Sequence, residues 1–158
     1  MTKIAPSTAV NRYYLARMAA AERNERMSSR EGASEETGID RKRMQRIEIG
    51  TLNPYPEEVL LMADSYHAPE LLNYHCSHCC PIGQRTVPRA EASELDRITV
   101  KCLNALEEIK WADKALLSIA RDGVLTADEV PQMEAVLAGV RNLATIAAEM
   151  QIYLEKHK

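Results

Sequence analysis

The densest group of chemically reactive side chains lies at residues 75–81, which read His-Cys-Ser-His-Cys-Cys-Pro. Zinc prefers thiolate and imidazole ligands, and Cys76 with Cys79, or Cys76 with Cys80, has a spacing that can bind one ion. A complete structural site needs a second pair of ligands from elsewhere in the chain. Three distant residues are candidates for that pair: Cys102, His67 and His157. No paired C-x-x-C or H-x3-H motif follows, so the metal signal is incomplete.

We interpret Cys76, Cys79 and Cys80 as reduced thiols that cover the end of a helix, and we expect no bound metal and no cofactor. A metal site and a redox pair stay open as alternatives, and either would make the protein a thiol- or metal-responsive regulator. The chain has no Ser-His-Asp set, HExxH motif, phosphate-binding loop or GxGxxG motif. We therefore expect a protein that is not an enzyme.

A second kind of chemistry is indicated by residues 38–50, GIDRKRMQRIEIG. Arg41, Lys42, Arg43 and Arg46 place four basic side chains within six residues, with no acid among them. The whole chain is nevertheless acidic, with a formal net charge of −3. This weak net charge argues against indiscriminate binding to polyanions, but it leaves room for a local basic face.

The basic face must lie in the first half of the chain. Residues 1–90 carry 12 Lys/Arg against 11 Asp/Glu, whereas residues 91–158 carry 8 against 12. No apolar run approaches the ~20 residues that a membrane span needs, and the N-terminus has no hydrophobic signal core. We therefore expect a cytoplasmic protein that does not bind membranes.

Helical periodicity dominates the sequence and no strand signal is present, so an all-α fold is predicted. The first helix is expected to begin near Ser7 or Thr8 and to end at about Asn24. Four apolar residues at helical spacing predict its buried face: Val10, Tyr14, Met18 and Ala21.

Cap residues predict the two helices that follow. Ser28 or Ser29 can cap a short helix, which would end at Gly38 because glycine tolerates the left-handed conformation there. Asp40 can cap the next helix, expected over residues 41–49 and stopped by Gly50.

Two more helical patterns, EEVLLMADSY and PELLNYH, complete the first half. The prolines, the glycine and the lack of periodicity in residues 77–90 then predict a linker. Beyond the linker, unbroken spacings of three and four residues predict two long helices folded back as an antiparallel hairpin. The first seam is Leu95, Ile98, Cys102, Ala105, Ile109, Ala112, Leu116 and Ile119; the second is Met133, Val136, Val140, Leu143, Ala147, Met150 and Leu154. Pro131 is expected to kink or restart the second helix.

The stretch from residue 28 to residue 54 resembles the XRE family, the Cro- and lambda-repressor-like helix-turn-helix DNA-binding domains. The resemblance rests on Gly38 at the turn, Ile39 pointing inward after it, and the motif Ile47-Glu48-x-Gly50 with Asn53-Pro54 downstream. It covers about residues 15–75, nearly half of the chain. The chain departs from the family in its second helix, where Ala33-Ser34 replaces the usual Leu-Ala.

The resemblance implies roles for particular residues. Those expected to contact DNA are Ser29 and Arg30, at phosphates, and Arg41, Lys42, Gln45 and Arg46, at base edges in the major groove. It also implies a buried structural ion pair between the first and third helices, which we assign to Arg23 and Glu48.

The expected protein is a transcriptional regulator, most simply a repressor, that binds an inverted-repeat operator on double-stranded DNA as a homodimer. Residues 8–76 would form the DNA-binding domain, and residues 91–158 the dimerisation hairpin. One alternative is an antitoxin or adaptor whose C-terminal helices hold another protein. A hairpin that packs on its own N-terminal domain, leaving a monomer, is a further alternative.

Overall fold

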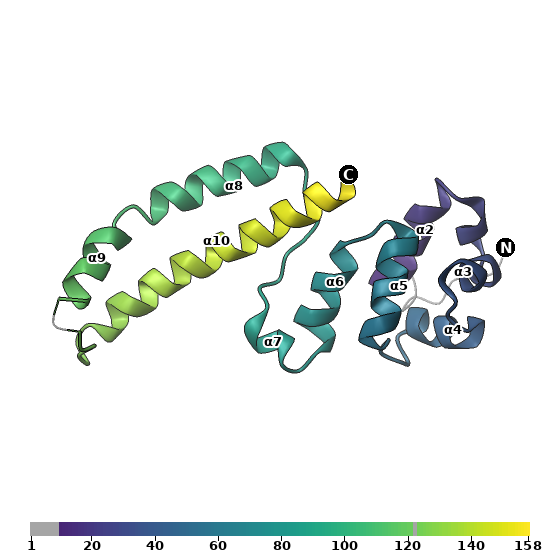
Figure 1. Ribbon diagram of the computed structural model, residues 1–158, viewed down its shortest axis with the longest axis horizontal. Coiled ribbons are helices and arrows are strands. Elements are labelled where there is room, and N and C mark those ends of the chain that lie inside the picture. The colour runs from purple at the N-terminus through teal and green to yellow at the C-terminus, as the bar shows by residue number, and fades with distance from the viewer. Residues whose placement is uncertain (1–9, 122) are drawn as a thin grey trace. The chain divides into compact units, whose positions relative to one another are not determined.

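The computed structural model describes residues 10–121 and 123–158, and all of its regular secondary structure is helical (Figure 1). The predicted all-α fold class is therefore confirmed. The chain divides into two compact units at the boundary between Val87 and Pro88. None of the helices in the described part of the chain is long and apolar enough to cross a membrane.

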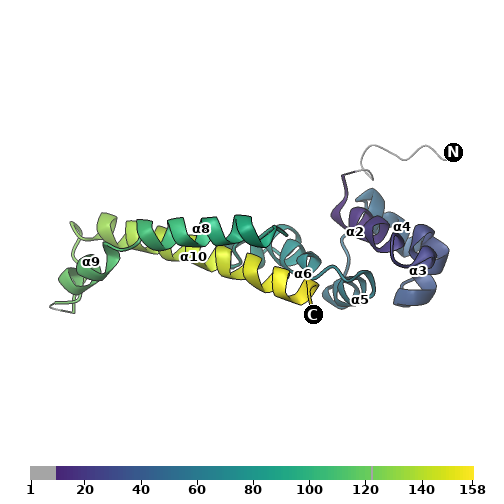
Figure 2. The ribbon, with the colours of Figure 1, turned by 90° about the horizontal axis from the view of Figure 1, so that it is seen from above.

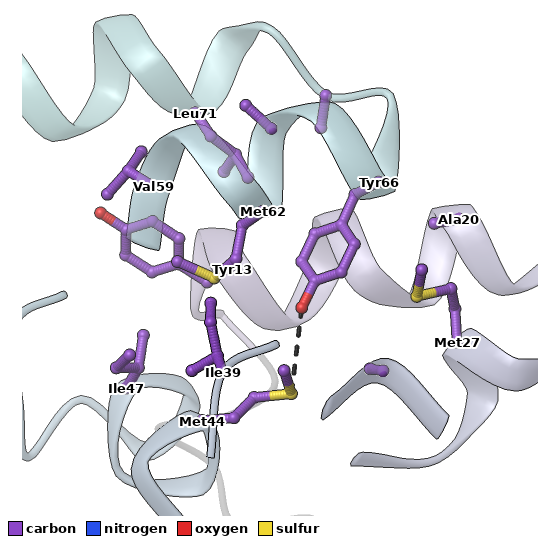
Figure 3. Close-up of a cluster of buried hydrophobic side chains, with 13 residues drawn as sticks. Tyr13, Ala20, Met27, Ile39, Met44, Ile47, Val59, Met62, Tyr66 and Leu71 are labelled. Atoms are coloured by element: carbon purple, nitrogen blue, oxygen red, sulfur yellow. Dashed lines mark hydrogen bonds between the residues drawn. The ribbon is translucent and has the colours of Figure 1, made fainter. Parts of the chain in front are cut away.

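Seven helical segments make up the described part of the first unit: α2 (Arg12–Ala21), the 3-10 turn Glu25–Ser28, α3 (Arg30–Thr37), α4 (Arg41–Ile49), α5 (Pro56–Tyr66), α6 (Glu70–Tyr74) and α7 (Gly83–Thr86), with a π-helical turn between α6 and α7. All of these segments except α7 contribute to one apolar core, and Figure 3 shows side chains of α2, α4 and α5 meeting in it. The Tyr66 hydroxyl donates to the sulfur of Met44 at 3.9 Å. This contact ties α5 to the buried side of α4.

The predicted ends of α3 and α4 are confirmed. The hydroxyl of Ser29 accepts from the Gly32 N–H at 3.0 Å, and Gly38 ends α3 at a φ of 72°. The Asp40 carboxylate accepts from the Arg43 N–H at 2.9 Å, and Gly50 ends α4 at a φ of 83°. Both glycines adopt the left-handed conformation that other residues avoid.

The predicted first helix is only partly correct. Its expected start at Ser7 or Thr8 lies outside the described residues; within them, α2 begins at Arg12 after the cap residue Asn11. The helix ends at Ala21, before the predicted Asn24.

The predicted buried face of α2 is wrong by about one residue, or ~100° of helical rotation. Tyr13, Arg17 and Ala20 are buried, whereas Val10 is 74% exposed. The apolar periodicity misleads here because the buried face contains an arginine. Burying that arginine requires an anionic partner, which is described below.

The segment predicted to be a linker, residues 77–90, is helical over part of its length. Residues His75–Cys79 form a π-helical turn, closed by the Cys80 N–H donating to the His75 carbonyl at 3.1 Å, and α7 follows. Gly83 makes this fold possible, because a Cβ there would lie 2.0 Å from the carbonyl oxygen of Cys76. The glycine that suggested a linker instead permits close packing of backbone on backbone.

The second unit is a helical hairpin of α8 (Leu95–Glu108), α9 (Ala112–Ile119) and α10 (Val130–Lys156). Figures 1 and 2 show α8 and α10 side by side and antiparallel, with α9 at the turn. The hairpin has a small core around Ile98, Ala105 and Ile146. A partly exposed ion pair lies beside this core, in which the Lys101 ammonium donates to the buried Glu149 carboxylate at 2.8 Å.

The first predicted long helix is interrupted, and this prediction was wrong. The chain leaves helical geometry at Ile109, so α8 and α9 are separate helices. The Ile109 side chain packs on Gly139 of α10, where a Cβ would lie 2.9 Å from Ile109 Cδ1. The predicted restart of the second helix is confirmed: α10 begins at Val130, Pro131 occupies its first turn, and the helix continues without interruption to Lys156.

The predicted seam of α10 combines two different faces of the helix. Val136 is buried, and Leu143 and Met150 pack against the core that α8 and α10 share. Val140 and Leu154, from the same predicted seam, are 48% and 60% exposed. Spacings of three and four residues therefore identified an apolar helix correctly but did not separate its inner side from its outer side.

Substitution of Gly32 tests the close packing of α3 on the backbone of the preceding 3-10 turn. A Cβ at Gly32 would lie 2.2 Å from the backbone carbonyl oxygen of Arg26. We expect Gly32→Ala to destabilise the protein by about 1–3 kcal/mol, because this overpacking exceeds the ~1 kcal/mol gain in helix propensity. The measurement is the urea midpoint by circular dichroism. Gly139→Ala is the matched control, because the atom nearest to the added methyl group is the end of the Ile109 side chain, which can move. A urea midpoint of Gly32→Ala equal to or higher than that of the wild type would contradict the expectation.

Candidate nucleic-acid interface

The outward side of α4 presents four polar side chains that are not used inside the protein. Arg41, Lys42, Gln45 and Arg46 are exposed, while Met44 and Ile47 on the opposite side are fully buried. Within residues 10–121 and 123–158, none of the four side chains forms an ion pair or hydrogen bond. The helix therefore offers three cations and one amide to a ligand outside the unit.

Glu48 anchors the inward side of α4. Its carboxylate accepts from Arg17 Nε at 2.6 Å and Arg17 Nη2 at 3.2 Å, and from Arg30 Nε at 2.6 Å. The side chains of Arg17 and Glu48 are only 3% and 2% exposed. Arg17 also donates from Nη1 to the Met27 carbonyl at 2.6 Å, so one buried arginine joins α2, the 3-10 turn and α4.

The predicted ion pair between Arg23 and Glu48 is therefore wrong, because the buried partner of Glu48 is Arg17. Arg23 is exposed beyond the end of α2, and its Nη2 donates to the Tyr66 carbonyl at 2.9 Å. Arg17 lies four residues after Tyr13 and three before Ala20, on the buried side of α2. Only that side of the helix can reach a carboxylate in the core.

Arg43, unlike the four outward residues of α4, is partly buried and has partners within the unit. Its guanidinium forms an ion pair with Glu58 of α5, with Nη2 donating to Oε2 at 2.9 Å, and it lies over the Tyr55 ring at 4.3 Å. Burial raises the pKa of the Glu58 carboxyl, but hydrogen bonds from Arg43 and the Tyr55 N–H outweigh burial and leave this pKa below its ordinary value. These contacts fix α4 against the start of α5.

Ser29 and Arg30, the two predicted phosphate contacts, have structural partners. The Ser29 hydroxyl caps α3, and Nε of Arg30 is bound to Glu48. The terminal nitrogens of Arg30 have no partner among the described residues, and its side chain is partly exposed. Arg30 can therefore offer these nitrogens outward while Nε stays bound.

Acidic side chains lie on α3 close to this surface in sequence, and some are neutralised locally. Arg26 donates to Glu36 at 2.8 Å and to Glu35 at 3.0 Å. These ion pairs are exposed, so they contribute little to stability. They reduce the repulsion that α3 would exert on an approaching polyanion.

The start of α2 is also tied to α4, since Asn11 Nδ2 donates to the Ile47 carbonyl at 3.0 Å. Together with the ion pairs of Glu48 and Arg43, this hydrogen bond holds the short helix at three points. A helix held in this way keeps the backbone positions of its outward residues fixed before any ligand arrives. Arg41 and Lys42 lie one turn before Gln45 and Arg46, as contacts along a groove require.

The segment that carries the clustered cysteines, residues 75–80, contacts α2 and not the outward side of α4. The Tyr13 hydroxyl lies 3.3 Å from His75 Nδ1 and 3.8 Å from Cys79 Sγ. Burial raises the pKa of the Cys79 thiol and lowers that of the His75 imidazole. A raised thiol pKa reduces the thiolate fraction, which favours an unreactive Cys79.

No group of three or more His, Cys, Asp or Glu side chains among residues 10–121 and 123–158 is placed to hold a metal ion. No protein-family model, curated protein or solved structure matches this chain. The surface of α4 and the contacts that hold this helix are therefore the features of the chain that indicate a function.

Sequence reasoning missed Arg17, the Arg43–Glu58 pair and the role of Asn11. The positions of Tyr13, Arg17 and Ala20, at spacings of four and three residues, were the available signal for a buried arginine. The pairing of Arg43 with Glu58 had no local signal, because it joins residues on different helices.

Proposed function

We propose that this chain is a sequence-specific DNA-binding transcriptional regulator of the lambda-repressor-like helix-turn-helix type. In this proposal, α3 and α4 with the Gly38 turn are the helix-turn-helix, and α4 enters the major groove. The observation that carries the proposal is the set of four unpaired polar side chains on the outward side of a helix held at three points.

The chemistry of these side chains fits base edges. An arginine can bond O6 and N7 of guanine in a bidentate way, and a glutamine can do the same with N6 and N7 of adenine. Arg41, Gln45 and Arg46 supply these groups, while Lys42 suits a guanine or a phosphate. The net charge of −3 over the whole chain keeps non-specific attraction to DNA weak.

One such domain makes few phosphate contacts, so the regulator is proposed to act as a homodimer on an inverted repeat. Two recognition helices on one face of the duplex lie ~34 Å apart, which is one helical turn.

Selection from a pool of random double-stranded DNA tests this proposal. The full-length protein should enrich an inverted repeat whose half-sites are about 10 base pairs apart from centre to centre. Affinity for the enriched site should exceed affinity for a scrambled duplex by at least ~10³-fold at physiological salt. A pool that shows no enrichment, or equal affinity for both duplexes, would exclude the proposed function.

A further inference from the structure

The hairpin has a second apolar row on α10 that does not pack on α8. The inner row includes Val136, Leu143, Ile146 and Met150. The outer row follows spacings of three and four residues, with a single polar interruption at Gln151: Val130, Met133, Leu137, Val140, Ala144, Ala147, Gln151 and Leu154. Its large side chains Leu137, Val140 and Leu154 are exposed. At ~100° per residue, the outer row is rotated by about 100° from the inner one.

The neighbouring helix α8 has a matching outer row. Ile98 and Ala105 are buried against α10, whereas Leu95, Leu103 and Leu106 are exposed. This exposed row is also displaced by about 100° from the buried row, in the same rotational sense as on α10.

The two outer rows lie on the same side of the hairpin. The helices run antiparallel (Figure 2), and their inner rows pack against each other in one core. On each helix, the outer row is reached from the inner row by the same rotation about the helix axis, seen along the chain direction. Because the two chain directions are opposite, these rotations bring both outer rows to the same side of the hairpin. They form a continuous surface, here named the outer face: Leu95, Leu103, Leu106, Leu137, Val140 and Leu154.

The shape of the outer face specifies a helical partner of similar length. The row on α10 extends from Val130 to Leu154, which is ~36 Å at 1.5 Å per residue. Regular three- and four-residue spacing over such a length is the requirement for packing against another helix along its whole axis. A second copy of α10 and α8 supplies that surface.

The size and charge of the outer face fit a second copy better than a membrane. Six large side chains that are each about half exposed leave on the order of 500 Å² of apolar surface, which matches the apolar share of one side of a standard interface. Both helices carry charges of both signs near the face: Lys110 pairs with Glu107, and α10 carries Glu134 and Arg141. Residues 91–158 carry 8 Lys/Arg against 12 Asp/Glu, which opposes adsorption to an anionic membrane.

We infer that the outer face pairs with the same face of a second copy, so that two hairpins form a four-helix bundle. This inference deepens the proposed function by assigning the surface through which the regulator dimerises. The inner row, which the predicted seam combined with the outer one, holds each hairpin together and takes no part in the pairing.

The test compares two variants with the same added charge on different sides of α10. Leu137→Glu with Val140→Glu places two carboxylates in the outer face. Ala138→Glu with Asn142→Glu, the control, places two carboxylates on exposed positions away from both rows. Mass is measured by light scattering at about 10 µM without DNA, with circular dichroism to verify the helix content.

The wild type and the control should have twice the 17.7 kDa mass of one chain, and the outer-face variant should have that of a single chain. A monomeric wild type, or an outer-face variant that still dimerises, overturns the inference. If the outer-face variant loses helix content, Leu103→Ser with Leu106→Ser on α8 replaces it, with the same expected masses.

The affinity for DNA separates this inference from the proposed function. The outer-face variant should lose about 100-fold or more of its apparent affinity for a full inverted repeat, while its affinity for a single half-site is unchanged. A dimer that binds no DNA would contradict the proposed function and leave the pairing intact.

Discussion

Replacement of Glu48 by alanine is expected to lower the free energy of unfolding of the first unit by about 3–5 kcal/mol. The variant leaves the guanidinium of Arg17 buried without a counter-charge, because the side chains of both partners are almost fully excluded from solvent. It also releases Arg30, whose Nε is bound to the same carboxylate. A urea titration followed by circular dichroism measures the loss.

The single tryptophan localises the effect. Trp111 is in the second unit, so its fluorescence reports the unfolding of the hairpin. Circular dichroism records the helices of both units. We therefore expect the part of its transition that comes from the first unit to move to lower urea, while the fluorescence transition stays in place. Equal shifts in both signals would mean that Glu48 supports the whole chain and not the first unit alone.

Two controls separate burial from charge. Arg26→Ala removes exposed ion pairs with Glu35 and Glu36 and should cost less than about 1 kcal/mol. The double variant Arg17→Met with Glu48→Leu replaces the buried pair by apolar side chains and should recover most of the stability that Glu48→Ala loses. A Glu48→Ala variant as stable as Arg26→Ala would contradict the buried network.

Alanine at Arg41, Lys42, Gln45 and Arg46 together is expected to abolish preference for the cognate DNA site. Each side chain should contribute ~1–3 kcal/mol to recognition of its base pair, so the fourfold variant should bind cognate and scrambled duplexes equally. The fold should survive, because all four side chains are exposed and alanine favours a helix. Competition binding at fixed salt measures the preference.

A charge-matched pair of variants distinguishes base recognition from general attraction. The first variant combines Arg41→Ala with Arg46→Ala, and the second combines Arg85→Ala with Arg89→Ala. Each variant removes two positive charges from exposed positions. The first variant should lose the preference for the cognate site, whereas the second should retain it. If both variants lose affinity equally for all sequences, α4 contributes only electrostatic attraction.

Local chemistry made α3 and α4 predictable from the sequence. Ser29 and Asp40 each accept from a backbone N–H three residues onward, and Gly38 and Gly50 end their helices in the left-handed conformation. Every one of these interactions spans only a few residues. The exposed side chains of α4 were predictable for the same reason, since helical spacing alone places Met44 and Ile47 opposite them.

The interior contacts of the first unit were not predictable in this way. Arg17 and Glu48 are separated by 31 positions, and Arg43 and Glu58 by 15. Arg23 and Arg17 are equally plausible partners of Glu48 by composition. Only the rotation of α2 about its axis, which the packing of Tyr13 and Ala20 sets, selects Arg17.

By itself, the sequence determined an all-α chain, the ends of α3 and α4, and the basic outward side of α4, because capping and helical spacing act between residues close in the chain. Only the tertiary structure decided which arginine is buried at Glu48 and where the first long helix breaks at Ile109. It also decided which apolar row of α10 faces α8. These choices depend on contacts between distant residues, whose geometry local spacing does not encode.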